Sequence, residues 1–153
     1  MLRLTWIEFF LRIIPETFIL IYGIHIISKK SFDIPEYILS SILLAILIFF
    51  VRWLPIYFGV HTIISIILTI SIMVIIKIPL IKAIYSTFLM YFILSLSEFL
   101  NMIILSFLTI NINILSPAIK CVYGAPSLIF ILLFIIMINN LLKMKEGIKN
   151  VSN

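Results

Sequence analysis

The sequence predicts an all-α integral membrane protein, a helical bundle of about five transmembrane helices. Of its 153 residues, 64% are hydrophobic and only 11% are charged, whereas a soluble domain is usually about half apolar and about a quarter charged. One small core cannot hide this much apolar surface, so lipid must cover it. Long apolar runs such as 42–48 lack the period-two alternation of a β-barrel strand. Because every backbone group in lipid needs an internal partner, these runs are expected to be helices.

Proline, lysine and arginine residues divide the chain into five apolar stretches. They predict spans at about 6–27, 37–53, 56–76, 80–110 and 119–142. We therefore expect residues 1–142 to form a single transmembrane helical domain and residues 143–153 to form a short basic cytoplasmic tail. The fourth stretch would be about 46 Å long as a helix, which predicts either a tilted span or a first turn around Lys82 that lies at the interface. A bundle of six spans is the alternative.

Two prolines predict irregular helices. Pro15 lies within the first stretch and would kink it, because it leaves the carbonyl of Leu11 without its usual donor. The segment Gly124-Ala125-Pro126 is expected to break the last helix for the same reason. The part of this helix within the membrane would then begin near Pro126, with residues 120–125 at the surface.

Basic residues next to the spans predict the orientation of the chain. In short loops, the side that is richer in lysine and arginine is the cytoplasmic side. With five spans, one side carries seven basic residues and the other carries three, so we expect a cell-membrane protein with its C-terminus in the cytoplasm and its N-terminus outside. The seven are Lys29, Lys30, Lys77, Lys82, Lys143, Lys145 and Lys149, and the three are Arg3, Arg52 and Lys120.

Ionisable residues inside the expected spans are the first candidates for function, because each costs a few kcal/mol to insert and usually needs a partner. Glu8, Arg12 and Glu16 are four residues apart and therefore share one face of the first helix. Glu98 and Asn101 share a face of the fourth helix in the same way. No basic residue lies within helical reach of Glu98, so we expect its partner to come from another helix, with Arg12 as the first choice.

The candidate residues all fall in the outer half of the bundle under this topology. Two interpretations remain open: a polar cavity that binds a ligand from outside, or a buried polar network that locks the helices together. Taken alone, Arg52 would extend to the outer headgroups, and His61 would be a hydrogen-bonded core histidine. The candidates are Arg12, Glu16, Arg52, His61, Glu98 and Asn101.

Sequence motifs give no sign of catalysis, and we expect a non-enzyme that has no cofactor and no metal site. The chain has one cysteine, Cys121, which excludes an internal disulfide and a cysteine-based zinc site. The spacing of Cys121 and His61 does not indicate a nucleophile and its base. H-E-x-x-H, G-x-S-x-G and phosphate-binding glycine loops are all missing. Basic residues are scattered rather than interleaved with aromatic ones, so we expect the lipid bilayer and not nucleic acid as a partner.

Three short segments resemble the N-terminal membrane region of sensor histidine kinases of Gram-positive bacteria that carry a GHKL-type ATPase domain. They are residues 12–16 (RIIPE), 52–55 (RWLP) and 58–62 (FGVHT). The resemblance implies that the membrane region receives a signal and that its last span leads to a cytoplasmic helix. This sequence departs from the family after Leu142, where no phospho-acceptor helix and no ATP-binding domain follow. Signalling would therefore need a separate cytoplasmic or membrane partner protein.

These observations favour a non-catalytic membrane sensor or regulatory subunit with a polar cluster in the outer half of the bundle. A small transporter, or the substrate-binding subunit of one, is an alternative, although the chain has only four glycines and no internal repeat. A structural membrane assembly partner is another alternative. Pairs of small residues four positions apart, at Ser41 and Ala45 and at Ser65 and Thr69, could support close helix contacts.

Overall fold

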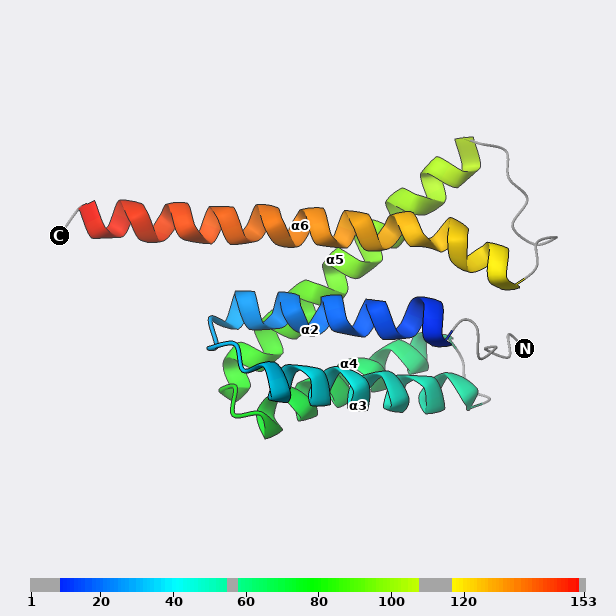
Figure 1. Ribbon diagram of the computed structural model, residues 1–153, viewed down its shortest axis with the longest axis horizontal. Helices are drawn as coiled ribbons and strands as arrows, with labels where there is room; N and C mark the ends of the chain where they lie inside the picture. The colour runs from blue at the N-terminus through cyan, green and yellow to red at the C-terminus, as the bar shows by residue number, and fades with distance from the viewer. Residues whose placement is uncertain (1–8, 55–57, 108–116, 152–153) are drawn as a thin grey trace.

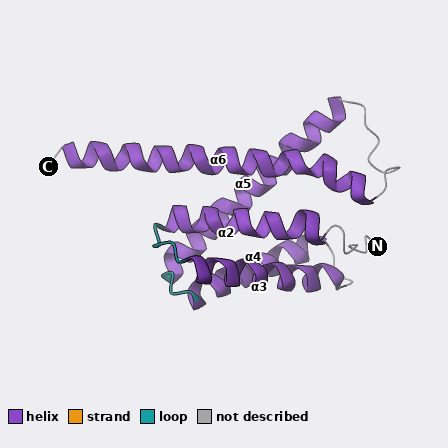
Figure 2. Ribbon diagram, in the orientation of Figure 1, coloured by secondary structure: helices purple, strands orange, loops and turns teal. Residues whose placement is uncertain are grey.

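The computed structural model describes residues 9–54, 58–107 and 117–151, and nearly all of these residues are helical (Figures 1 and 2). No strand occurs within these ranges, so the predicted all-α bundle is confirmed. The elements are a π-helical turn η1 (Phe9–Ile13) and the helices α2 (Ile14–Ser28), α3 (Ile34–Trp53), α4 (Phe58–Ile75), α5 (Leu80–Phe107) and α6 (Pro117–Val151).

Four segments of the described chain are long and apolar enough to cross a membrane. They are Phe9–Ser28, Ile34–Trp53, Leu80–Phe107 and Tyr123–Met144, and the shorter apolar helix Gly59–Ile75 lies between the second and the third. The molecule is therefore a membrane-embedded helical bundle. The predicted spans agree with these helices to within a few residues at each described end, except that α6 continues as a helix to Val151, nine residues past the expected end of the last span.

Successive helices run in opposite directions between two ends of the bundle (Figure 1). We call the end at which α2 begins the N end, and the end at which α2 finishes the C end. Helix α5, with 28 residues, crosses the others obliquely. Helix α6 extends beyond the other helices at the C end, where the chain terminates.

The two prolines have different consequences from those expected. Pro15 lies in the first turn of α2 and directly follows the π-turn η1, so the irregularity predicted for this helix takes the form of a widened turn. The predicted break at Pro126 is wrong, because α6 is helical on both sides of it. Neighbouring side chains can satisfy backbone groups that a proline leaves free inside a bundle. Next to Pro126, the hydroxyl of Ser127 donates to the Gly124 carbonyl at 2.6 Å, whereas the carbonyl that loses its helical donor to Pro126 is that of Val122.

Helix α2 is the centre of the bundle and packs against α3, α5 and α6. Gly23 allows the closest approach, because a Cβ atom at this position would collide with the side chain of Met90 and lie 3.1 Å from Cδ1 of Ile135. The small residues singled out in the sequence are all buried, which is consistent with close helix contacts: Ser41, Ala45, Ser65 and Thr69.

A lysine joins three segments at the C end. The ammonium of Lys30 lies 2.6 Å from Oε2 of Glu36 at the start of α3, and it also donates to the carbonyl of Ile76 just after α4. Beside it, His25 is buried and its Nδ1 lies 3.0 Å from the carbonyl of Ile21. The ring also packs edge-on against Phe32.

Two helices at the C end finish at lysines in the left-handed conformation. Lys29 has φ 53° and Lys77 has φ 65°, and each helix end shows the paired hydrogen bonds of a Schellman motif. A Cβ atom in this conformation costs roughly 1–2 kcal/mol. Exchanging Lys77→Gly is therefore expected to raise the free energy of unfolding by about 1 kcal/mol, measured by SDS titration of helicity. Lys82→Gly, inside α5, is the control and should lower it by about 1 kcal/mol.

Candidate functional site

Four charged side chains from three helices meet towards the N end. The central one is Glu16 of α2, whose side chain is only 9% exposed. Its Oε2 lies 3.8 Å from Nε of Arg12, one turn earlier, and its Oε1 lies 3.7 Å from Nη2 of Arg52 on α3. On the other side, Nη2 of Arg12 donates to Oε1 of Glu98 on α5 at 2.7 Å. The order Arg52–Glu16–Arg12–Glu98 alternates in sign, and its formal charges cancel. We call these residues the charge chain.

The partner predicted for Glu98 is confirmed. Arg12 lies 86 residues away in the sequence, and it reaches Glu98 because α2 and α5 pack against each other. Glu8, the third residue on this face of the first helix, lies outside the described residues. Within the described part of this face, the pairing of Arg12 with Glu16 follows the i, i+4 spacing and is also observed.

Arg52 does not behave as expected for an isolated arginine. We expected it to extend to the headgroups, but its guanidinium turns towards Glu16 and its side chain is one-third exposed. The carboxylate of Glu16 has the opposite charge and attracts the guanidinium of Arg52 from the neighbouring helix. Sequence spacing could not reveal this contact, because it depends on how α2 and α3 cross.

Helix α6 meets this region through its backbone. The side-chain amide of Asn101 on α5 donates to the carbonyl of Tyr123 at 3.0 Å. Arg12 lies against the next residue, since Nη1 is 3.9 Å from the place where a Cβ atom of Gly124 would stand. Asn101 is buried, and its Oδ1 accepts no hydrogen bond from the residues that the structure describes. About two turns into α6, Tyr123 thus accepts a hydrogen bond from α5, and Gly124 lies close to Arg12 of the charge chain.

His61 is not joined to the charge chain by any ion pair or hydrogen bond among the described residues. It is half-buried, and its buried Nδ1 has no hydrogen-bond partner there, so the expectation of a hydrogen-bonded core histidine is not met at this atom. The side chain of Cys121 lies outside the described residues, so its proposed pairing with His61 does too. No group of three histidine, cysteine or acidic residues suited to a metal ion occurs in the described ranges.

A short polar contact that the sequence did not indicate lies deeper in the bundle. The hydroxyl of Thr69 on α4 donates to the Ser65 carbonyl at 2.8 Å and lies 3.1 Å from the hydroxyl of Tyr91 on α5. These groups satisfy each other between α4 and α5. The position of Thr69 in a small-residue pair was the only sequence signal, and it indicated close packing rather than a hydrogen bond.

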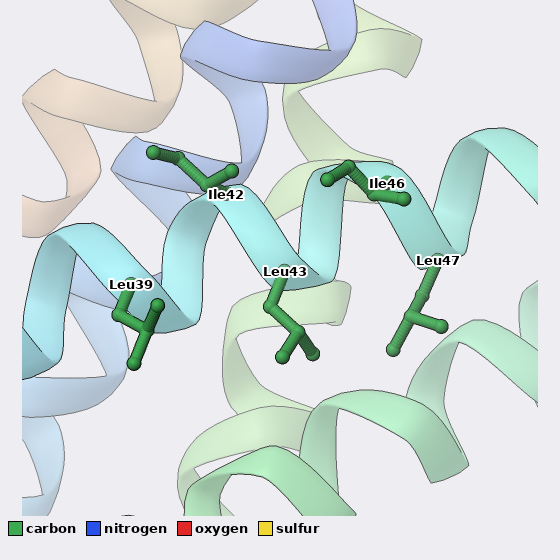
Figure 3. Close-up of a pocket in the computed structure, with 5 residues that line it drawn as sticks. All are labelled: Leu39, Ile42, Leu43, Ile46 and Leu47. Atoms are coloured by element: carbon green, nitrogen blue, oxygen red, sulfur yellow. The ribbon is translucent and has the colours of Figure 1, made fainter.

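A hollow on α3 has a different character from the charge chain. Figure 3 shows its lining, which consists only of apolar side chains on one segment of the helix. Such a surface can contact an acyl chain, but it has no group that could orient a polar ligand or take part in chemistry. Its lining residues are Leu39, Ile42, Leu43, Ile46 and Leu47.

The fold and the site together define a small membrane-embedded helical bundle with an internally neutral charge chain near one end. Comparison with protein-family models, with curated proteins and with solved structures finds no match to this chain. The features of this chain that bear on function are therefore the charge chain, the part of α6 beside it, and the length of α6.

Proposed function

We propose that this chain is a non-catalytic membrane sensor or regulatory subunit in which the charge chain controls the position of α6. The observation that carries the proposal is that Arg12 pairs with Glu98 and also lies against Gly124 at the start of α6. If Arg12 separates from Glu98, its guanidinium moves relative to Gly124, and the packing of α6 at the N end changes.

The length of α6 supports transmission to the other side of the bilayer. This helix has 35 residues and is continuous from Pro117 to Val151, so a change in its tilt at the N end moves its far end in the opposite sense. That far end extends past the bundle at the C end (Figure 1). It carries three lysines and one glutamate, and we propose that it contacts a separate signalling protein: Lys143, Lys145, Glu146 and Lys149.

The distribution of basic residues supports the orientation that we propose. In the described chain, Lys29, Lys30 and Lys77 lie at the C end, whereas Arg52 lies at the N end and turns towards Glu16. By the positive-inside rule, the C end would then lie on the cytoplasmic side of a cell membrane. A signal from outside would reach the charge chain from the N end, which agrees with the resemblance to histidine-kinase sensor regions.

A distance measurement between spin labels tests whether the charge chain controls α6. The labels are placed at Ile67→Cys on α4 and Met144→Cys on α6, both exposed in the structure, in a Cys121→Ser background in nanodiscs. Exchanging Glu98→Gln removes the carboxylate charge that holds Arg12, so we expect the distance distribution to shift or broaden. Glu36→Gln is the matched control, because it weakens a carboxylate–cation pair outside the charge chain, at the C end, and should leave the distribution unchanged.

An unchanged distribution in Glu98→Gln would contradict the proposal, because a sensor requires two arrangements whose populations the signal can alter. The charge chain would then be a static network, and the structural assembly partner would become the better description. Equal shifts in Glu98→Gln and Glu36→Gln would also contradict it, since they would show general loosening of the bundle rather than control by the charge chain.

A further inference from the structure

The charge chain leaves hydrogen-bond acceptors free on one face of α5. Glu98 uses only Oε1 in the described structure, where it accepts from Arg12, and its side chain is 39% exposed. Three residues further along α5, Asn101 is 93% buried, since only 7% of its surface is exposed, and its Oδ1 has no partner among the described residues. Residues three apart lie on the same helix face. A buried acceptor without a donor is costly, which indicates that a donor group belongs there.

The backbone of α6 adds a further acceptor close by. Pro126 has no amide hydrogen, so the carbonyl of Val122 lacks the donor that a helix normally supplies four residues later. Tyr123 follows Val122 in α6, and its carbonyl accepts a hydrogen bond from Asn101. The missing backbone hydrogen bond of Val122 therefore lies next to α5. In the described part of the chain, Oε2 of Glu98 and Oδ1 of Asn101 thus have no donor at this junction of α5 and α6, and Pro126 supplies none to the Val122 carbonyl.

We propose that the junction binds a primary ammonium group, on the outer side of the membrane if the orientation proposed above is correct. An ammonium carries three N–H donors and a positive charge, which matches several acceptors that include one carboxylate. A quaternary ammonium has the same charge but no N–H donor and would leave Asn101 unsatisfied. The ligand is either the headgroup of an amine-bearing phospholipid or a soluble primary amine, such as the amino terminus of a peptide. This inference names the signal for the proposed sensor and therefore rests on the proposed function.

The distances in the charge chain indicate how binding would be transmitted. Arg12 lies 2.7 Å from Glu98 but 3.8 Å from Glu16, which is beyond hydrogen-bond distance. An ammonium that binds the Glu98 carboxylate competes with Arg12 and weakens the pair between Arg12 and Glu98. The tie between α2 and α5 is then lost, and the guanidinium shifts relative to Gly124 at the start of α6.

Two binding experiments on the full-length chain separate the two sources of the ammonium. In the first, the protein is placed in nanodiscs that contain equal amounts of phosphatidylethanolamine and phosphatidylcholine with identical acyl chains, and the retained lipids are measured by native mass spectrometry. In the second, ethylamine is titrated into nanodiscs of phosphatidylcholine alone and detected by NMR, with tetramethylammonium as the quaternary comparison. In one of the two experiments we expect the primary amine to bind roughly tenfold more tightly than the quaternary one. This factor corresponds to one hydrogen bond to a charged group.

Variants show whether the preference comes from this junction. Glu98→Gln and, independently, Asn101→Ala should each abolish the preference, and the second variant leaves the charge chain intact if the first does not fold. Glu36→Gln, which changes a carboxylate paired with Lys30 at the C end, should retain it. Preference for the phospholipid supports the lipid source, and preference for ethylamine supports the soluble source.

No preference in either experiment, or a preference that survives both variants at the junction, would overturn the inference. Its failure is distinct from failure of the proposed function. If the spin-label distance responds to Glu98→Gln but no primary amine binds, the sensor remains and the ammonium is wrong. If a primary amine binds through Glu98 and the distance does not respond, the site is correct and the control of α6 is wrong.

Discussion

Replacing Arg12 with methionine is expected to lower the free energy of unfolding by about 3 kcal/mol, the low end of the range for breaking a buried ion pair. The low end applies because the side chain of Arg12 is 38% exposed. The substitution keeps the apolar stem of the residue but leaves Glu98 without its partner and Glu16 with Arg52 alone. The measurement is SDS titration of the protein in mixed micelles, followed by circular dichroism.

A triple variant provides the control for the Arg12→Met experiment. Combining Arg12→Met with Glu16→Gln and Glu98→Gln removes the stranded carboxylates as well as the guanidinium, and replacing buried charges together is often neutral. We expect it to recover at least half of the lost free energy of unfolding. If the triple variant were less stable than Arg12→Met alone, the carboxylates would be stabilising without Arg12, and the charge chain would have been assigned wrongly.

Exchanging Gly23→Leu is expected to prevent normal folding, because this residue lies where α2, α5 and α6 converge. Even a Cβ atom there would collide with the side chain of Met90, and the rest of a leucine would extend towards Ile135. Overpacking of a core usually costs 1–3 kcal/mol. The effect here should be at the upper end, since both neighbours are fully buried. Thermal unfolding in detergent and the yield of monodisperse protein measure it.

Two further variants isolate the cause of the Gly23→Leu defect. Gly59→Leu places the same side chain on α4 at a position where a Cβ atom meets nothing within 4 Å, so it should fold normally. Gly23→Ala combined with Met90→Ala should be more stable than Gly23→Ala alone, because the colliding side chain is then shortened. Equal defects at the two glycines would show that leucine is harmful for a reason other than packing between α2, α5 and α6.

Composition and charge spacing were sufficient to predict much of this protein. The excess of apolar residues predicted a membrane-embedded all-α bundle, since backbone in lipid must form hydrogen bonds within its own segment. The spacing of Arg12 and Glu16 predicted a shared face, and the absence of any basic residue near Glu98 predicted a partner on another helix. These predictions succeeded because they depend on local geometry or on the cost of an unpaired charge in lipid.

Other features could not be predicted from the sequence because they depend on contacts between helices. The path of α6 through Pro126, the orientation of Arg52 towards Glu16, and the free acceptor on Asn101 each follow from which helices pack together and how they cross. The sequence determined that charged groups would need partners within an apolar bundle. Which groups meet depends on how the helices pack: Arg12 and Glu98 are 86 residues apart, yet they come within 2.7 Å because η1 leads into α2, which packs against α5.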